Sequence, residues 1–274
     1  MAETALREKC GIDVCIEIIR TTGDETSAKN LSGRKGIFTA ELERALLDRR
    51  IDLAVHSAKD LPSEMNCALG IAAVLPRGPV EDLLIMKRRS VSSFGTIATG
   101  SIRRERQLRW LKKPKEIVDL RGNVPTRLRK FAQSDWDAII LARAGLERLG
   151  LSVPKFVFEG HEFFAQVLQV DQFVPAGGQG IIALQTRRKE ASFVSRIDHR
   201  DTHLCLQAER EFLRLLQGDC SLPVGAHARF VNGEMELFVQ LFDEGDTPRM
   251  AKARGSNPLK IAKEVFKKIA QDRV

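Results

Sequence analysis

The sequence predicts a mixed α/β protein with two α/β units and a smaller α+β unit at its C-terminal end. Two observations lead to this expectation. Between about residues 95 and 151, short apolar runs alternate with amphipathic helical stretches, which is the pattern of parallel βαβ units. Near the C-terminus the order changes to a hairpin with an Asn232-Gly233 turn, followed by a helix. A length of 274 residues is enough for such an arrangement with a sizeable core.

The first unit is expected to begin with the partly alternating run 13–20, which predicts a strand. A polar loop containing several glycines follows. Apolar residues at helical spacing then predict a helix within 39–50. The run 51–55 predicts a buried strand, and Pro62 ends this stretch.

The second unit is expected to contain three strands that each lead into a helix. Ser101 has the residue type and place of an N-cap for the first of these helices. Pro125 fits the first position of the second helix. The third strand passes into its helix within 136–151, so the whole unit is expected to hold parallel strands joined by helical crossovers.

The chain is then expected to return to the first unit. A glycine-rich turn within 173–180 precedes a strand-like run, and a long amphipathic helix follows within 201–220. We therefore expect three domains, which comprise residues 1–75 with about 176–197, residues 76–175, and residues 198–274.

The charge balance suggests an anionic ligand. The chain has 44 Lys and Arg against 36 Asp and Glu, which gives a net charge of +8. Nucleic-acid recognition motifs are absent, and 6% aromatic residues with no Tyr leave few platforms for stacking bases. A small ligand that bears carboxylates or phosphates is therefore the competing explanation, and we expect no nucleic-acid partner.

Several features predict a cytoplasmic protein without disulfides or metal. No apolar run approaches the roughly 20 residues of a membrane span, and no secretory signal is visible, so we expect no membrane partner. Five cysteines are an odd number, and none has the spacing of a zinc ligand set. Most of them are expected to be small buried hydrophobes. Cys220 differs because it lies in a turn flanked by Pro223 and Gly225.

Polar and charged residues gather where the predicted strands end. In open α/β sheets, ligands bind outside the carboxyl ends of the strands, where helix N-termini add positive potential. Any one Arg there is more often a solvated surface charge, so the prediction of a ligand site depends on the coincidence of several at the strand ends. Together they predict a crevice for a ligand with several carboxylates. The set comprises Ser57, Lys59, Asp60, Thr99, Ser101, Arg103, Arg104, Arg121, Asn123, Arg127, Arg143 and Arg148.

Asp60 and His56 are interpreted separately from the arginines at the strand ends. A carboxylate facing a cationic crevice stays ionised, so Asp60 can hold a developing positive charge or accept a hydrogen bond from a ring N–H. A turn cap is the alternative role for Asp60. His56 lies on a strand that looks buried, which favours a hydrogen-bonded core histidine over a catalytic one.

Six strings in one order carry a family resemblance. They are "GRKGIFTAELERALLDRRIDLAVHSAKDLPSEM", "TGSIRRERQLRW", "LRGNVPTRLRKF", "DAIILARAGLERLGL", "VPAGGQGIIALQTR" and "GDCSLPVGAHA". Together they closely resemble the porphobilinogen deaminase, or hydroxymethylbilane synthase, family. The resemblance runs from about residue 10 to the hairpin near 240.

The resemblance implies an activity in tetrapyrrole and haem biosynthesis. The family condenses four porphobilinogen molecules head to tail into hydroxymethylbilane and releases ammonia each time. A dipyrromethane cofactor, held by a thioether to a loop cysteine, serves as the primer. The implied fold has two α/β domains that resemble periplasmic binding proteins and a small α+β domain that carries the cysteine. A monomer is expected.

The resemblance also implies roles for individual residues. Cys220 matches the cysteine that holds the cofactor, and Asp60 matches the catalytic aspartate, which stabilises cationic pyrrole intermediates through their ring nitrogens. The residues matched to cofactor binding are Lys59, Arg103, Arg104, Arg121, Ser101, Thr99 and Asn123. Those matched to substrate binding are Arg127, Arg148, Ser57, Gln179, Lys35 and Phe38.

One departure from the family leaves alternatives open. The family normally begins with a strand that bears an Arg-x-Ser-x-Leu-Ala type motif, and this chain starts after that point, so its first strand is expected to be missing. An impaired, truncated deaminase copy is therefore one alternative. A non-catalytic protein of the periplasmic-binding type, for an acidic metabolite, is another.

Overall fold

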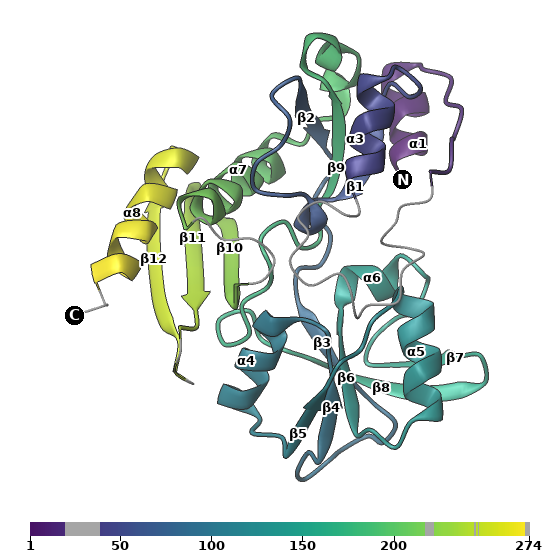
Figure 1. The fold of residues 1–274 in the computed structure, drawn as a ribbon, viewed down its shortest axis with the longest axis vertical. Coiled ribbons are helices and arrows are strands. Elements are labelled where there is room, and N and C mark those ends of the chain that lie inside the picture. The colour runs from purple at the N-terminus through teal and green to yellow at the C-terminus, as the bar shows by residue number, and fades with distance from the viewer. Residues whose placement is uncertain (20–38, 217–221, 244, 246, 272–274) are drawn as a thin grey trace.

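The computed structural model describes residues 1–19, 39–216, 222–243, 245 and 247–271. Within these residues the strands form three sheets. Figure 1 shows a three-stranded sheet at the top, a six-stranded sheet below it and a second three-stranded sheet at the left. The fold is thus mixed α/β, as the sequence predicts.

The six-stranded sheet has the order β5-β4-β6-β3-β8-β7. Its core strands β4 and β6 are parallel, as are β4 and β5, so the predicted crossovers through α4 and α5 are confirmed. The other neighbours are antiparallel. The strands are β3 (Asp82–Met86), β4 (Thr96–Ala98), β5 (Glu116–Val118), β6 (Ala138–Ala142), β7 (Lys155–Phe158) and β8 (His161–Val167), and the helices are α4 (Ile102–Leu111), α5 (Val124–Gln133) and α6 (Arg143–Glu147).

Both faces of this sheet are buried. Leu83, Ile85 and Phe131 belong to the apolar cluster on one face, and Leu84 and Leu108 belong to the cluster on the other. All five residues of β3 are buried, because side chains pack against this inner strand on both faces of the sheet. Such continuous apolar runs are typical of strands that are covered on both faces.

The upper sheet has the order β1-β9-β2, and both of its neighbouring pairs are antiparallel. Its central strand β9 comes from late in the sequence, so the expected return of the chain to the first unit is confirmed. The strands are β1 (Ala54–Ser57), β2 (Leu69–Val74) and β9 (Ile182–Arg187), accompanied by α1 (Ala2–Ala5), η1 (Leu6–Cys10), α3 (Ala40–Leu47), η3 (Ala58–Asp60) and η4 (Arg188–Ile197).

The expected strand at 13–20 is wrong over its described part. Residues 11–19 form neither helix nor strand, and the side chains of Ile16 and Ile18 are 65% and 86% exposed. An alternating run becomes a strand only where a neighbouring strand satisfies its backbone groups and a core covers its apolar side. In the described part of the chain, β1 pairs with β9 and with no other strand. The run 11–19 therefore has no strand beside it that could satisfy its backbone groups. The next expected strand also starts later, at Ala54 rather than Ile51.

The C-terminal unit is an antiparallel sheet covered by two helices. The predicted hairpin between β10 (Val224–Val231) and β11 (Glu234–Leu241) is confirmed, and β12 (Arg249–Gly255), which the sequence analysis missed, extends it. Asn232 and Gly233 have φ values of 52° and 84°, as a type I′ turn requires. Phe212 of α7 (Arg200–Leu215) and Val265 of α8 (Pro258–Gln271) pack in the same core cluster as the strands.

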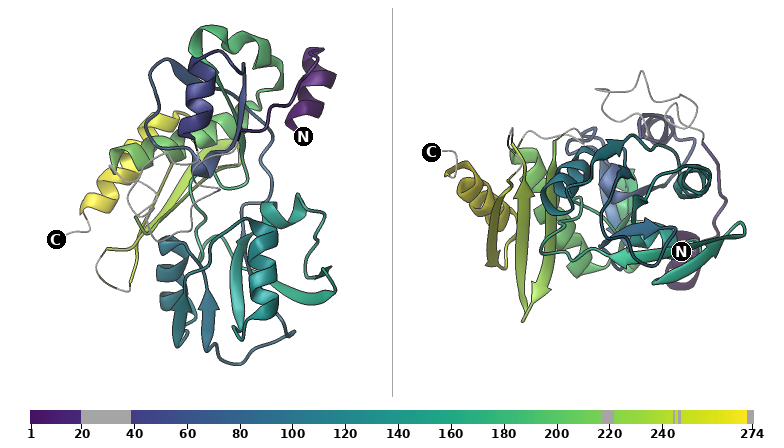
Figure 2. Two further views of the ribbon diagram at one scale, coloured as in Figure 1. Left: turned by 45° about the vertical axis from the view of Figure 1, so that its right-hand side comes forward. Right: turned by 90° about the horizontal axis from the view of Figure 1, so that it is seen from below.

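Two crossover segments, 75–81 and 168–181, join the upper sheet to the six-stranded one. They run beside each other, since the Gly78 amide donates to the Gly180 carbonyl at 3.0 Å. Glu209 of α7 ties both segments to the C-terminal unit: it accepts Nη1 of Arg77 at 2.6 Å, and it accepts the amides of Gly178 and Ala228 at 2.7 Å each. Figure 2 shows the three units meeting around these segments from two further sides.

The N-cap of α5 makes a testable contribution to stability. The side-chain oxygen of Asn123 accepts the Thr126 amide at 2.9 Å, and Pro125 occupies the second helical position rather than the predicted first. Replacing Asn123 by Ala is expected to lower the free energy of unfolding by about 1 kcal/mol, because that amide loses its partner. Asn123→Ser keeps an acceptor and is the control. Urea titration measures both, and an equal midpoint for Ala and Ser would contradict the capping role.

Candidate functional site

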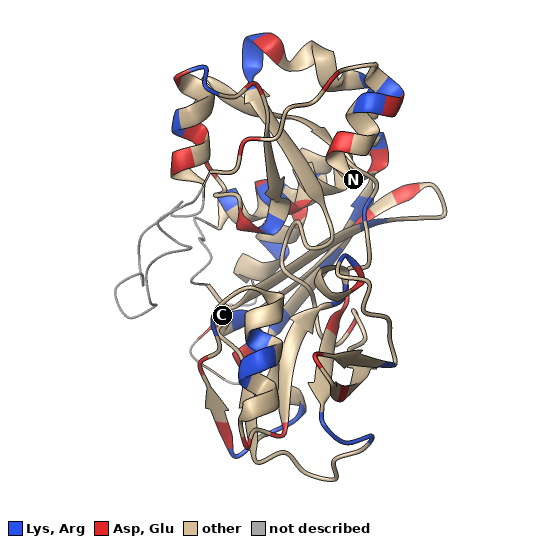
Figure 3. Cartoon of the chain, turned by 90° about the vertical axis from the view of Figure 1, so that its right-hand side faces the viewer, with Lys and Arg blue, Asp and Glu red and all other residues tan. Residues whose placement is uncertain are grey.

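Polar residues from the upper and lower sheets meet where the two sheets face each other. Lys59 and Asp60 form the 3-10 turn that directly follows β1. Helices α4 and α5 begin just after β4 and β5 end, so their N-termini and the carboxyl ends of those strands share one edge of the six-stranded sheet. This edge is the place where open α/β sheets bind ligands. In Figure 3 Lys and Arg, drawn in blue, recur where the upper and lower parts of the molecule meet.

Gly178 brings the second crossover close to the Lys59 turn. Its φ of +77° favours glycine, and a Cβ at this position would lie 2.8 Å from the backbone nitrogen of Lys59. The predicted glycine-rich turn therefore serves as a close contact between backbones. It fixes the end of β1, and with it Lys59 and Asp60, against the crossover.

Arg103 and Arg104 are buried, with 4% and 5% of their surfaces exposed. Both donate to Asp82, the first residue of β3: Nη2 of Arg103 reaches Oδ2 at 2.7 Å, and Nη2 of Arg104 reaches Oδ1 at 2.7 Å. Burial alone would raise the pKa of Asp82, but the two guanidiniums outweigh it and hold that pKa well below its usual range. The carboxylate therefore stays charged.

The remaining cations of the site repel one another. Burial is the main reason that the pKa of Lys59 is lowered, and Arg104 and Arg103 lower it further while Asp60 opposes them. Burial also lowers the pKa of Arg127 to about 10, with repulsion from Arg104 and Arg121 contributing. Lys59 thus lies within electrostatic range of Arg104 and Asp60, and Arg127 lies within electrostatic range of Arg104, Arg121 and Asp60. An excess of close positive charge is what a ligand with several carboxylates would neutralise.

Three of these charged side chains remain accessible. Asp60 is exposed, and Arg121 is exposed beside Asp119, whose Oδ1 accepts its Nε at 2.9 Å. Arg127 is half-buried, and its Nε donates to the Gly122 carbonyl at 2.6 Å. Surface ion pairs such as Arg121–Asp119 are weak, so an incoming carboxylate can compete for that guanidinium.

The predicted polar residues take mainly local partners. Ser101 caps α4 by accepting the Arg104 amide, and the buried Thr99 hydroxyl accepts the Ser101 amide at 3.3 Å. Ser57 is half-buried at the end of β1. Gln179 is only 1% exposed, and its Nε2 donates to Asp82 at 3.0 Å and to the Val80 carbonyl at 2.7 Å.

Two further arginines lie at the edge of the site. Arg148 is exposed, and its Nη2 donates to the Gly180 carbonyl at 3.1 Å. Arg143 binds Glu147 through Nε at 2.7 Å and Glu81 through Nη1 at 3.2 Å. These two carboxylates satisfy Arg143 within the protein, so we expect it to stabilise the end of β6.

Three of the residues predicted from the resemblance lie outside the described residues. They are Lys35, Phe38 and Cys220. Of the other four cysteines, Cys205 is buried, and burial chiefly raises the pKa of its thiol to about 12. Cys10 is half-buried, and Cys15 and Cys67 are exposed, so the expectation that most cysteines are buried hydrophobes is wrong for the described part of the chain.

The sequence analysis missed Asp82 and Glu209, two carboxylates with no exposed surface. Asp82 stands at the start of the apolar run 82–86, and an acidic residue adjoining such a run is a signal that could have suggested a buried partner for the arginines. The interpretation of His56 is confirmed: it is buried, and its Nε2 lies 2.9 Å from Oε1 of Gln185.

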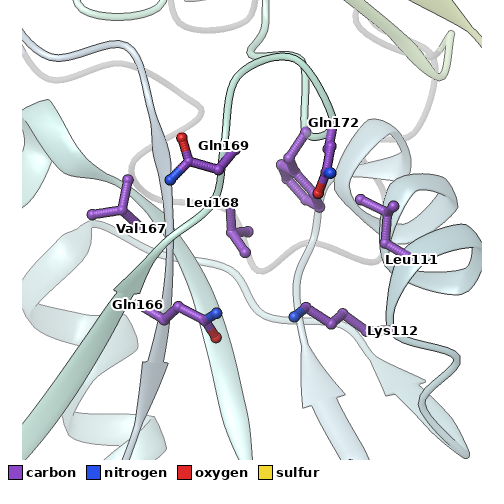
Figure 4. Close-up of a pocket in the computed structure, with 8 residues that line it drawn as sticks. Leu111, Lys112, Gln166, Val167, Leu168, Gln169 and Gln172 are labelled. Atoms are coloured by element: carbon purple, nitrogen blue, oxygen red, sulfur yellow. The ribbon is translucent and has the colours of Figure 1, made fainter.

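A pocket lies away from this edge (Figure 4). None of the predicted site residues lines it. Its walls are Leu111, Lys112, Gln166, Val167, Leu168, Gln169, Gln172 and Phe173. Among the described residues, no cluster of His, Cys, Asp and Glu could hold a metal ion. No helix within the described ranges is long and apolar enough to cross a membrane.

Comparisons with known proteins identify the family of this chain. Residues 1–195 match the family model "Porphobilinogen deaminase, dipyromethane cofactor binding domain", and residues 203–272 match "Porphobilinogen deaminase, C-terminal domain". The chain is 42% identical to the porphobilinogen deaminase of Syntrophomonas wolfei over 235 residues, which cover 82% of this chain and 74% of that one. It is 34% identical to that of Clostridium acetobutylicum over 279 residues, which cover 98% and 92%. This chain therefore belongs to the porphobilinogen deaminase family.

Proposed function

We propose that this chain condenses four porphobilinogen molecules head to tail into hydroxymethylbilane and releases one ammonia at each addition. The observation that supports this most strongly is the match of both family models over nearly the whole chain, joined to a cationic cluster around Asp60. Each added unit brings further carboxylates, so the growing product requires several cations in one place. The comparisons give no support to a non-catalytic binding protein.

The described residues fit a dipyrromethane cofactor. Nε of Arg104 and Oε1 of Gln179 are buried and have no hydrogen-bond partner among the described parts of the chain. A buried polar atom without a partner is costly, and a ligand with carboxylates and pyrrole N–H groups supplies both an acceptor and a donor. When bound, the dipyrromethane supplies a covalent primer to which substrate units are added. We propose that Cys220 holds it through a thioether.

The charged residues have two kinds of role, which are the binding of carboxylates and the stabilisation of charge during the reaction. Lys59, Arg104 and Arg121 bind carboxylates of the cofactor, and Arg127 and Arg148 bind those of the substrate. Asp60 is the one exposed carboxylate of the 3-10 turn beside these cations. It accepts a hydrogen bond from a pyrrole N–H and stabilises the positive charge that develops on the ring as ammonia leaves.

The polar residues act mainly through the backbone. Thr99, Ser101 and Asn123 order the N-termini of α4 and α5, whose free amides favour carboxylates. Arg103 orders the same edge from within the sheet, and Gln179 lines the site through the second crossover. Ser57, Lys35 and Phe38 are assigned to substrate binding through the family resemblance.

The finer architecture is part of the same proposal. The three sheets support domains of residues 1–75 with about 176–197, residues 76–175, and residues 198–274. The first two are proposed to resemble periplasmic binding proteins. A monomeric enzyme in the cytoplasm, without nucleic-acid or membrane partners, stays a prediction from the sequence.

The direct test is to incubate the purified chain with porphobilinogen and to follow ammonia and linear tetrapyrrole together. One ammonia per consumed porphobilinogen is expected. Tight porphobilinogen binding without ammonia release would instead indicate the non-catalytic alternative.

Substrate affinity is expected to depend on the charge of Arg127. The protonated guanidinium binds carboxylate and predominates below its pKa of about 10. The KM for porphobilinogen should therefore rise as pH increases from about 8 towards 10, because the uncharged form has lost its attraction for the ligand. Steady-state kinetics over this range measure the rise. In Arg127→Gln the KM should be higher at pH 8 and should rise less, whereas an unchanged pH profile would exclude this role.

A further inference from the structure

Asp82 occupies an unusual position, because one buried carboxylate serves two adjacent arginines. It has no exposed surface, and it lies at the beginning of β3 opposite Ala142 at the end of β6. Each oxygen accepts one guanidinium nitrogen at 2.7 Å. Oδ1 also accepts Nε2 of Gln179 at 3.0 Å. Asp82 therefore links two arginines of the six-stranded unit to the second crossover.

The two arginines differ in how far the protein satisfies them. Nη1 of Arg103 donates to the Val174 carbonyl at 2.7 Å, while Nη1 of Arg104 donates to the Ile140 carbonyl at 3.1 Å. With Asp82 as the second contact, each guanidinium is held at two points, and its plane is fixed. Nε of Arg104 is nevertheless buried without an acceptor in the described part of the chain. A donor held this way favours an acceptor from a ligand.

The charges around Asp82 also favour the binding of an acceptor from a ligand. Asp82 contributes one negative charge beside two buried guanidiniums, so the group keeps an excess positive charge, and Lys59 lies within electrostatic range of it. If Asp82 only neutralised cations, it would weaken the binding of carboxylates. If it holds Arg104 in a fixed orientation, it strengthens that binding. The two roles therefore predict opposite effects of removing its charge.

We propose that Asp82 is a positioning residue, which fixes the guanidinium of Arg104 so that Nε–H remains available to a ligand carboxylate. The identity of this ligand, as the dipyrromethane or porphobilinogen, rests on the proposed function. The geometry of Asp82, Arg104 and Gln179 does not depend on the proposed function. Asp82 itself touches no substrate atom in this role.

The test is a double-mutant cycle of Asp82→Asn and Arg104→Lys. Asn keeps one acceptor but turns a donor towards a guanidinium, so Arg104 loses its orientation. Lys keeps the charge of Arg104 but lacks Nε–H. The readouts are the fraction of chain that carries the added cofactor mass and the KM for porphobilinogen. Each single variant is expected to lower the loaded fraction and to raise KM at least about tenfold, and the double variant should be no worse than Arg104→Lys alone.

A matched control separates positioning from general loss of stability. Asp137→Asn makes the same change in the same sheet at its opposite end, where Oδ2 accepts the Gly95 and Thr96 amides at 2.7 and 3.0 Å. It should lower the unfolding midpoint without changing KM. Additive effects in the cycle, or a lower KM in Asp82→Asn, would overturn the proposal.

A second measurement does not depend on the folding of Asp82→Asn. The ¹H–¹⁵N resonance of Arg104 Nε, assigned through its loss in Arg104→Lys, is expected to shift between the cofactor-loaded protein and Cys220→Ser. An identical resonance in both would overturn the proposal. If the wild-type chain carries no added mass, the proposed function fails instead, and titration of that chain with porphobilinogen tests separately, through the same resonance, whether Arg104 Nε–H meets a ligand carboxylate.

Discussion

Replacing Asp60 by Asn is expected to lower kcat for porphobilinogen consumption by about two to four orders of magnitude. Asn is nearly isosteric and still accepts a hydrogen bond, but it lacks the negative charge that stabilises a cationic pyrrole. The carboxylate-binding cations remain in Asp60→Asn, so KM should change far less than kcat. Steady-state kinetics with ammonia detection separate the two constants.

Asp135→Asn is the control for this prediction. Asp135 is also exposed, but it lies before β6, at the end of the sheet away from the site. Its kcat should equal that of the wild type. If Asp60→Asn kept more than about a tenth of the wild-type kcat, Asp60 would have the role of a turn residue, and the catalytic assignment would fail.

Replacing Cys220 by Ser is expected to abolish turnover completely. A thiolate is a strong nucleophile, whereas a serine hydroxyl at its ordinary acidity is a weak one, so the variant cannot form the link to the primer. The exposed thiol of Cys67 offers a matched control, and Cys67→Ser should retain full activity. Wild-type turnover by Cys220→Ser would exclude the proposed anchor.

Much of the fold could be predicted where the local sequence pattern matches the strand pairing that the structure shows. The strand–helix pairs of β4, α4, β5, α5 and β6 show apolar strands, a side-chain cap at Ser101 and amphipathic helices, and all form as expected. Residues 11–19 have a comparable alternating pattern but remain outside the described sheets, because pairing depends on a neighbour that the local pattern does not specify. The sequence analysis did not predict β2, β3, β7, β8 or β12. The strands β2 and β3 pair with β9 and β6, which are distant in sequence. The strands β7 and β12 pair with the adjacent β8 and β11, so sequence distance does not explain why they were missed.

The candidate site was predictable as a set of charges but not as a set of contacts. Helix starts at strand ends locate Arg103 and Arg104 correctly at one edge of the sheet. The hydrogen bonds from both arginines to Asp82 depend on the pairing of β3 with β6. This pairing brings Asp82 close to Arg103 and Arg104, which follow it by about 20 positions in the sequence. The same holds for Glu209, whose three partners come from two crossovers and a strand of another sheet.

The intact mass of the purified chain tests the central claim most directly. Protein expressed in a host that makes porphobilinogen is expected to carry, at Cys220, the mass of two porphobilinogen units less two molecules of ammonia. Peptide mapping after digestion locates the addition. Loading also requires a working site, so this one value reports on the site and the anchor together. A mass equal to that of the bare chain, in protein that is folded and was exposed to porphobilinogen, would contradict the account.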